Sequence, residues 1–292
     1  MYMVENVIKD IPIIIFHIGN QEYVHLCLKQ ATKYNNNVHI LTDNKNYFNY
    51  NNVFSINFNE YSLFSNKFKN IYKHFSSNPY NYELICICRW FCIYEYMKKN
   101  NIDSAFICDS DVLIYDNISY IIKNYLKEDM YLCTSSSKNI TGGQSFFHLE
   151  KLEKFVEFCF EFYNTQTDNM NNWYKNYKQE GGICDMTLLY YFVNNSKIFI
   201  GLRLPDFPRY ENDLTNIYNN EFTFDLHLST YGNHLYPEEY EINQLNKNKN
   251  IKFIDNKPYC FNKRLNKDIR FVLLHFQGRN KNIMKKFYNI SN

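Results

Sequence analysis

The stretch Ser104-Ala105-Phe106-Ile107-Cys108-Asp109-Ser110-Asp111-Val112-Leu113-Ile114-Tyr115 indicates the fold most directly. Residues 104–108 form a short apolar run of the kind that makes a buried strand. The run ends in two carboxylates one residue apart, and a second apolar run follows at 112–115. In open α/β sheets the ligand crevice lies beyond the carboxyl ends of the strands, so Asp109 and Asp111 are expected to face a ligand.

Outward from this stretch, the pattern predicts an α/β chain. Strands at 11–16 and 38–41, joined by a helix from about 22 to 34, form an opening βαβ unit. The region 45–79 is irregular and is expected to hold a loop, a short strand near 53–58 and a helix. The remaining predicted elements are a buried helix at 84–98, a helix near 118–126, strands at 131–134 and 142–148, a helix at about 149–163, a polar connector at 173–179, a helix at 184–192, short strands and turns from 198 onward, and a final strand at 271–274.

The bulk properties limit the class of protein. A length of 292 residues suits one α/β domain spanning 1–292, with a nucleotide-binding half at about 11–116 and an acceptor and donor-sugar half at about 117–292. A net charge of +2 without a basic block argues against nucleic-acid binding. The nine cysteines lie mostly in apolar runs, which indicates reduced core thiols.

Residues 1–12 carry charges before their first apolar run, which is not the pattern of a secretory signal. No apolar stretch approaches the roughly 18 residues that cross a bilayer. We therefore expect a cytoplasmic protein without a transmembrane segment. Peripheral attachment to a membrane and the oligomeric state stay open.

Three residues form a candidate metal site. Asp109 and Asp111 can converge on a hard divalent cation where the strand bends into its loop, although such a pair is also compatible with a solvated strand end. His275 ends the apolar strand at 271–274 and precedes Gly278 and Lys281. In the pattern H-x-x-G-x-x-K the glycine lets the backbone approach a phosphate and the lysine supplies positive charge. The histidine can bind the same cation as the two aspartates. The alternative is that this histidine has a structural role. Carboxylates with an imidazole favour Mn²⁺ over Mg²⁺.

These motifs resemble those of GT-A nucleotide-sugar glycosyltransferases, and they are most similar to the glycosyltransferase family 8 pattern. The similar segments are residues 11–16, the Asp-Ser-Asp motif in 106–115, Thr141-Gly142-Gly143-Gln144 before an apolar strand, and His275-x-x-Gly278-x-x-Lys281. The resemblance implies a Rossmann-like mixed central sheet flanked by helices. It also implies metal-dependent transfer of a sugar from a nucleotide-sugar, by resemblance a UDP-sugar, to a glycan, lipid-linked or protein acceptor.

The resemblance also assigns roles to residues. Asp109, Asp111 and His275 would bind Mn²⁺ or Mg²⁺. The donor nucleotide would contact His17, Asn20 and Asp43 with its nucleoside, Gly278 and Lys281 with its diphosphate, and Ser110 near the metal. The sugar substrates would contact Gly142, Gly143, Gln144 and Asp185. Arg89, a lone cation in an apolar helix, needs an anionic partner, which a donor phosphate, a metal-site aspartate or a structural ion pair would provide.

Asp185 and Asp111 are the candidate catalytic residues. Asp185 opens a helix, so it is also compatible with a cap or dipole partner. Met186 stands where the family has the residue nearest the anomeric carbon, and the stereochemistry therefore stays open. Retention would use a front-face attack assisted by the leaving diphosphate, whereas inversion would make Asp185 the general base. In both cases the metal and Lys281 would offset charge on the leaving phosphate.

Two other functions fit part of the pattern. A phosphatase of the haloacid dehalogenase type would use Asp109 as its nucleophile. Its motif normally lies near the start of the core, and a later acidic pair completes its Mg²⁺ site, whereas here a βαβ unit precedes Asp109 and no such pair follows a late apolar strand. A non-catalytic carbohydrate-binding protein of the same fold is the third hypothesis, and the intact set of candidate ligands argues against it.

Overall fold

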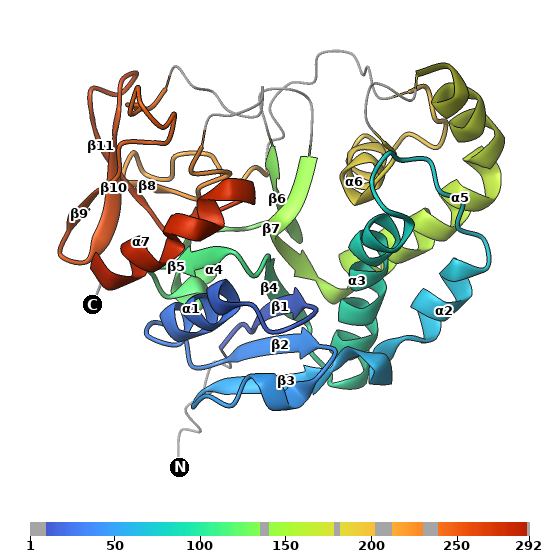
Figure 1. Cartoon of the computed structure of the whole chain (residues 1–292), viewed down its shortest axis with the longest axis horizontal. Coiled ribbons are helices and arrows are strands. Elements are labelled where there is room, and N and C mark those ends of the chain that lie inside the picture. Colours follow the sequence, from blue (N-terminus) through green and yellow to red (C-terminus); the bar gives the residue numbers. More distant parts are fainter. Residues whose placement is uncertain (1–9, 135–139, 178–181, 202–211, 230–238, 291–292) are drawn as a thin grey trace, which may run out of the picture.

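A six-stranded mixed sheet lies at the centre of the computed structural model, which describes residues 10–134, 140–177, 182–201, 212–229 and 239–290. Its strand order is β3-β2-β1-β4-β7-β6 (Figure 1). The first four strands in this order are parallel, and β7 runs antiparallel to both of its neighbours. The strands are β1 (Ile13–His17), β2 (Val38–Thr42), β3 (Val53–Asn57), β4 (Ser104–Cys108), β6 (Met130–Thr134) and β7 (Ile140–His148).

Helices bury both faces of this sheet, which explains why its central strands are apolar at consecutive positions. Side chains alternate along each strand, so Ile14 packs into one apolar cluster and Ile13 and Ile15 into the other. The first cluster includes residues of α2 (Leu63–Lys69), α3 (Tyr80–Lys99), α5 (Leu149–Tyr177) and α6 (Asp185–Val193). The second includes α1 (Glu22–Ala31), α4 (Ile118–Tyr125), α7 (Met284–Ile290) and the C-terminal strands.

The C-terminal part adds a second sheet with the order β8-β11-β10-β9 (Figure 1). Its strands are β8 (Phe222–Thr223), β9 (Lys252–Ile254), β10 (Lys257–Asn262) and β11 (Lys267–Phe271). The chain then forms β12 (Leu273–His275), which pairs antiparallel with β5 (Val112–Ile114) and sets His275 opposite Val112. This pairing brings the end of the chain to the loop that follows β4.

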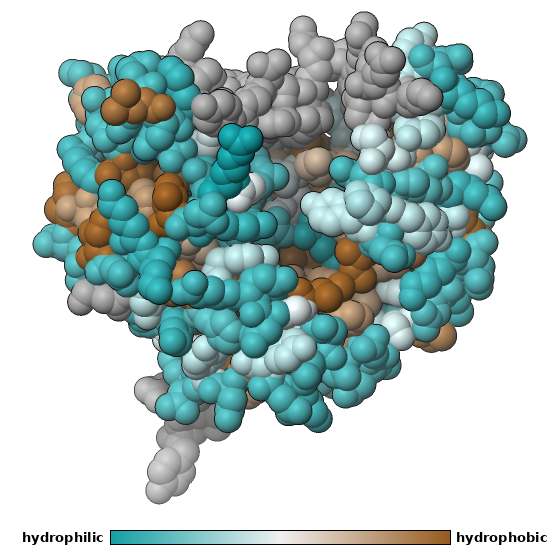
Figure 2. All heavy atoms as spheres, in the orientation of Figure 1, coloured by the Kyte–Doolittle hydropathy of each residue, from teal (hydrophilic) through white to brown (hydrophobic). Residues whose placement is uncertain are grey.

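The short 3₁₀ helices are η1 (Lys45–Tyr47), η2 (Phe58–Tyr61) and η4 (Gly278–Ile283). Hydrophilic side chains cover most of the face in Figure 2. No helix of the described segments is long and apolar enough to span a bilayer.

The predicted mixed α/β architecture is confirmed, and two of its boundaries were wrong. The polar connector expected at 173–179 is helical through Tyr177, because Trp173 packs edge-on against Phe199 with ring centroids 5.8 Å apart; residues 178–179 lie outside the described part of the chain. The final strand expected at 271–274 is two strands that are interrupted at Val272. All nine cysteines are free thiols, as predicted. The division into halves at 116/117 stays a prediction.

Candidate functional site

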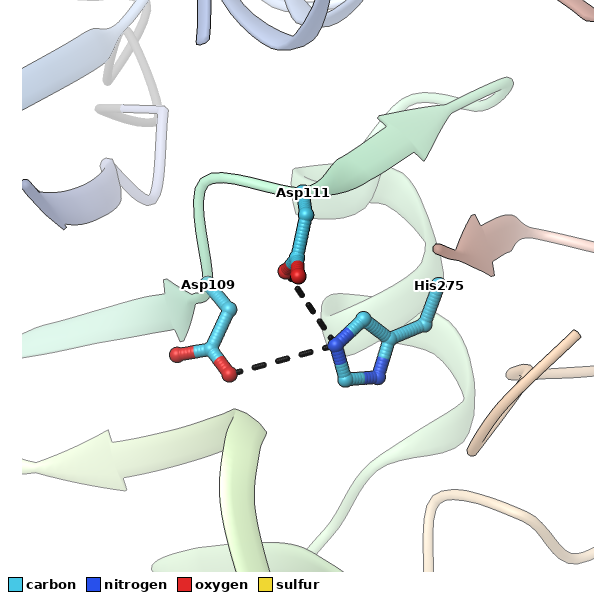
Figure 3. A group of neighbouring side chains, drawn as sticks. All are labelled: Asp109, Asp111 and His275. Carbon is cyan, nitrogen blue, oxygen red and sulfur yellow. Dashed lines mark ion pairs between the residues drawn. The ribbon is translucent and has the colours of Figure 1, made fainter. Parts of the chain in front are cut away.

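Asp109, Asp111 and His275 converge at one point (Figure 3). Asp109 follows β4, Asp111 precedes β5, and His275 ends β12. One ligand atom from each residue lies within 4.8 Å of the others. His275 Nε2 is 3.2 Å from Asp111 Oδ1 and 3.9 Å from Asp109 Oδ2. The predicted metal ligands are therefore brought together from the loop between β4 and β5 and from the end of β12.

The orientation of His275 suits a metal ligand. Its Nδ1 lies 2.7 Å from the carbonyl oxygen of Leu226, to which it donates. Nε2 is buried without a regular hydrogen bond and faces the two carboxylates. A histidine ligand typically donates its second nitrogen to a backbone carbonyl in this way. One imidazole nitrogen and two carboxylate oxygens fit Mn²⁺. Mg²⁺, which prefers oxygen ligands more strongly, is the alternative.

A buried ion pair supports His275 from behind. Asp225 Oδ2 accepts the backbone N–H of His275 at 3.0 Å, and its Oδ1 lies 2.6 Å from Lys249 Nζ. The side chains of Asp225 and Lys249 are 0% and 5% exposed, so each needs the other to offset the cost of leaving water. Lys249 also donates to the carbonyl oxygen of His227 at 2.6 Å. Sequence reasoning missed this pair, because its partners lie in weakly patterned segments.

Positive charge surrounds Asp111. Lys281 Nζ lies 3.1 Å from Asp111 Oδ2, and its ammonium also lies over the ring of Tyr23, 5.0 Å from the centroid. Burial alone would raise the pKa of Asp111, but His275 and Lys281 outweigh it and hold that pKa well below its ordinary value. Burial likewise works to lower the pKa of His275, but Asp111 and Asp109 raise it to about 9. Without a cation, a proton on His275 thus balances the carboxylates.

The stability of the metal-free protein is expected to fall as the pH rises through the slightly alkaline range. The folded pKa of His275, about 9, lies above its ordinary value of 6.5. Its charged interaction with the aspartates is fully present below about pH 6.5 and is lost as the pH passes about 9. Thermal unfolding with a chelator across this range measures the slope, and the same slope in His275→Asn would contradict this assignment.

Arg89 links the metal cluster to Asp185. Its Nη1 lies 2.6 Å from Asp109 Oδ1 and its Nη2 lies 2.8 Å from Asp185 Oδ2. Trp90 Nε1 donates to the same Asp185 oxygen at 3.1 Å, and the backbone N–H of Met186 donates to Oδ1 at 2.9 Å. Asp185 is thus held in a fixed orientation beside the cluster. One of the anionic partners of Arg89 is the metal-site residue Asp109, which was one of the predicted possibilities.

Two adjacent glycines fit the wall of this site closely. A Cβ at Gly142 would lie 2.2 Å from the indole of Trp90, and one at Gly143 would lie 2.7 Å from Asp109 Oδ2. The carbonyl of Gly143 also accepts the backbone N–H of Asp109 at 2.7 Å. Gly142 and Gly143 therefore leave room for the side chains that form the site. Whether they also contact substrate stays a prediction.

Substituting Gly143 with Ala is expected to weaken Mn²⁺ binding roughly 10- to 100-fold, in the range typical of changes around metal ligands. The new methyl group would displace the Asp109 carboxylate, which lies too close to accommodate it. Titration of Mn²⁺ by electron paramagnetic resonance measures the affinity. Ser145→Ala, in the same strand, is the control that should keep it, and an unchanged affinity in folded Gly143→Ala would disprove the steric argument.

Gly278 and Lys281, which are predicted to contact the donor diphosphate, follow His275; that contact stays a prediction. Gly278 has a φ of +63°, a backbone conformation that residues other than glycine rarely adopt. A Cβ added to this residue would meet no atom within 4 Å. Open space beside a glycine backbone lets a phosphate approach closely. Lys281 lies three residues further on and reaches Asp111.

The residues predicted for the nucleoside lie at the carboxyl ends of β1 and β2. His17 Nε2 donates to Gln21 Oε1 at 2.5 Å, so its Nδ1 accepts from Ser110 Oγ at 2.9 Å. Burial lowers the pKa of His17. Ser110 therefore connects the metal loop with β1.

Three other predicted residues make local contacts. Asp43 Oδ1 accepts the backbone N–H of Gly19 at 2.9 Å, and Asn20 Oδ1 lies 2.6 Å from His25 Nε2. Gln144 is only 1% exposed, and its Oε1 accepts from the Cys133 thiol at 3.3 Å. Ligand contacts by Asn20, Asp43 and Gln144 stay predictions.

Two solved structures of glycosyltransferases are similar to the chain at low sequence identity. No protein-family model and no curated protein matches the chain. The apo structure of mouse xyloside xylosyltransferase 1 is similar with a TM-score of 0.42 and 10% identity, over 63% of this chain and 81% of that one. The apo structure of WbbM, a bifunctional glycosyltransferase, is similar with a TM-score of 0.35 and 10% identity, over 52% of this chain and 35% of that one. Both TM-scores are below 0.5, so neither likeness supports a function.

Proposed function

We propose that this chain is a metal-dependent glycosyltransferase that moves a sugar from a nucleotide-sugar, a UDP-sugar by the motif resemblance, to a hydroxyl of a glycan, lipid-linked or protein acceptor. The observation that carries the proposal is the convergence of Asp109, Asp111 and His275 beside Lys281 and the open backbone at Gly278. These groups lie beyond the carboxyl end of β4, where ligands of α/β sheets bind. Together they suit a cation and a diphosphate.

In this reaction the bond between the anomeric carbon and the diphosphate oxygen breaks, and a bond from the acceptor oxygen to the same carbon forms. The diphosphate leaves with the electron pair, and the acceptor hydroxyl loses its proton. A divalent cation at such a site supplies charge neutralisation on the leaving diphosphate. Lys281 would contact the same oxygens and stabilise the developing charge.

Asp185 would orient the sugar being transferred or the acceptor hydroxyl. Its carboxylate is held by hydrogen bonds from Arg89, Trp90 and the Met186 backbone. A substrate hydroxyl could therefore donate a hydrogen bond to a carboxylate that is already oriented. Arg89 would also keep Asp109 and Asp185 from repelling each other and the donor. Both roles rest on position beside the cluster.

A phosphatase is less favoured by the same geometry. Phosphatases of the haloacid dehalogenase type need a second acidic pair, from a strand late in the chain, to complete their Mg²⁺ site. Here β12 places His275 beside Asp109 and Asp111 instead. In the part of the chain that the structure describes, the cluster of Asp109, Asp111 and His275 is the one candidate metal site. A carbohydrate-binding protein without turnover needs no such site.

Incubation with a panel of UDP-sugars and Mn²⁺ tests the proposal. We expect slow release of UDP by hydrolysis, abolished by a chelator. Binding of UDP-sugars without any turnover, with or without added saccharides, would favour the carbohydrate-binding alternative. Release of phosphate from phosphate esters, with Asp109 modified, would favour the phosphatase.

A further inference from the structure

Lys281 has two partners in the structure, and they come from different elements. Its Nζ lies 3.1 Å from Asp111 Oδ2 and 5.0 Å from the centroid of the Tyr23 ring. Tyr23 lies in the first turn of α1, and its ring also packs edge-on against His17, with centroids 5.7 Å apart. The ammonium of Lys281 is thus held between a candidate metal ligand and the face of an aromatic ring, which attracts cations.

Both oxygens of Asp111 are engaged. Oδ1 lies 3.2 Å from His275 Nε2, on the side of the candidate metal site, and Oδ2 faces Lys281. A cation bound by Asp109, Asp111 and His275 would therefore share one carboxylate with the ammonium of Lys281. Like charges this close repel, so Lys281 weakens the site for a cation that binds alone.

The charges around the site lead to the same conclusion. Arg89 pairs with Asp109 and Asp185, and Lys281 pairs with Asp111. Three carboxylates therefore face two cationic side chains, which leaves one surplus negative charge for a cation that carries two positive charges. A diphosphate would supply the missing negative charge, and it would also attract Lys281.

Lys281 is better placed than Arg89 to change its partner. Its side chain is 35% exposed and ends in a compact ammonium on a flexible stem, whereas Arg89 is 20% exposed and both of its terminal nitrogens are engaged. Gly278, whose open backbone we assign to the diphosphate, begins the same 3₁₀ helix, one turn before Lys281. A ligand at that backbone would compete with Asp111 for the ammonium.

We propose that Lys281 exchanges Asp111 for the diphosphate when metal and nucleotide bind, and that Tyr23 is a positioning residue that keeps the ammonium at the site in both arrangements. The exchange removes a repulsion from the cation as the diphosphate arrives, so each ligand strengthens the binding of the other. This role rests on the proposed glycosyltransferase function, because it requires a nucleoside diphosphate beside the cation. The cation and the nucleotide then bind as a pair, with Lys281 as the link.

Titration of Mn²⁺ by electron paramagnetic resonance, with and without UDP, tests the exchange. In the wild type we expect UDP to tighten Mn²⁺ binding at least about tenfold. Lys281→Met should tighten the binding of Mn²⁺ alone at least about fivefold, the effect of one unit charge a few ångström away in water. UDP should then tighten Mn²⁺ binding by a correspondingly smaller factor. A titration of Mn²⁺ with UDP and no protein corrects for the complex that the two form in solution.

The affinity for UDP is expected to change in the opposite direction. At saturating Mn²⁺, Lys281→Met should bind UDP at least about tenfold more weakly, because the diphosphate loses a charged donor. Calorimetry measures this affinity. Tighter metal binding together with weaker nucleotide binding is the signature of the exchange, and a lysine that contacts phosphate alone would not produce it.

Variants of Tyr23 test the positioning role. Tyr23→Leu removes the aromatic face and should move both affinities in the same directions as Lys281→Met, by about threefold. Tyr23→Phe keeps the ring and should keep both within about twofold of the wild type. Lys285→Met is the matched control, because Lys285 pairs with the exposed Glu22 next to Tyr23. Its loss removes the same charge without changing a contact of Asp111, so both affinities should stay those of the wild type.

The outcomes separate the exchange from the function itself. If Lys281→Met weakens UDP binding but leaves the affinity for Mn²⁺ alone unchanged or lower, the exchange is wrong and the transferase stands. If Tyr23→Leu weakens UDP binding and leaves Mn²⁺ binding unchanged, Tyr23 contacts the nucleotide and does not position Lys281. Failure of the wild type to bind UDP with Mn²⁺ overturns the proposed function as well. Thermal unfolding of each variant shows that a changed affinity does not come from a lost fold.

Discussion

Replacing Asp111 with Asn is expected to reduce metal-dependent sugar transfer and donor hydrolysis by at least about a thousandfold, because a bound metal supplies several kcal/mol of charge stabilisation. Asp111 is 5% exposed and faces both His275 and Lys281. An amide there removes one anionic ligand and leaves two cationic groups facing each other. Release of UDP from a UDP-sugar with Mn²⁺ measures the loss.

Asp116 provides a matched control for this variant. It is a carboxylate five residues further on, and it pairs with Lys257 and Arg270. Asp116→Asn therefore also removes a carboxylate charge between two cations, but outside the candidate site. Equal losses of activity in the two variants would show that the effect is a general loss of stability and not of metal binding.

Replacing Lys249 with Met is expected to lower the free energy of unfolding by about 3–5 kcal/mol, the usual cost of breaking a buried ion pair from one side. Asp225 would keep its charge at 0% exposure without its cation. The same carboxylate holds the backbone of His275, so Mn²⁺ affinity should also fall. Chemical unfolding and Mn²⁺ titration measure the two effects.

The double variant Lys249→Met with Asp225→Asn identifies the cause. Asparagine removes the uncompensated charge and keeps an oxygen for the His275 N–H, so part of the lost stability should return. A double variant less stable than Lys249→Met alone would contradict the ion-pair account. Lys252→Met, which breaks an exposed pair with Asp268, should cost about 1 kcal/mol or less.

The metal ligands were predictable because their signals are local. Asp109 and Asp111 follow an apolar run, and His275 follows another, so each lies at a strand end by pattern alone. Their convergence depends on the pairing of β12 with β5, which joins residues about 160 positions apart. The H-x-x-G-x-x-K pattern and the motif resemblance suggested a shared cation, but no local signal predicted the strand pairing itself.

Other parts of the site carry no local signal. Trp90 lies in an apolar helix and its pattern predicts a core residue, yet its indole N–H binds Asp185. Asp225 and Lys249 come from segments without clear periodicity, and their burial follows from tertiary packing. The extension of α5 through Tyr177 likewise depends on the contact of Trp173 with Phe199. In each case a distant partner decides the role of the residue.

The most direct test of the central claim is a thermal-shift titration of UDP with and without Mn²⁺, because a ligand that binds the native state raises its apparent stability. The account predicts that UDP stabilises the wild type only when Mn²⁺ is present and that Asp111→Asn loses this effect while Asp116→Asn keeps it. Equal stabilisation by UDP with and without metal, or no stabilisation by any nucleoside diphosphate, would contradict the proposed cation and diphosphate site.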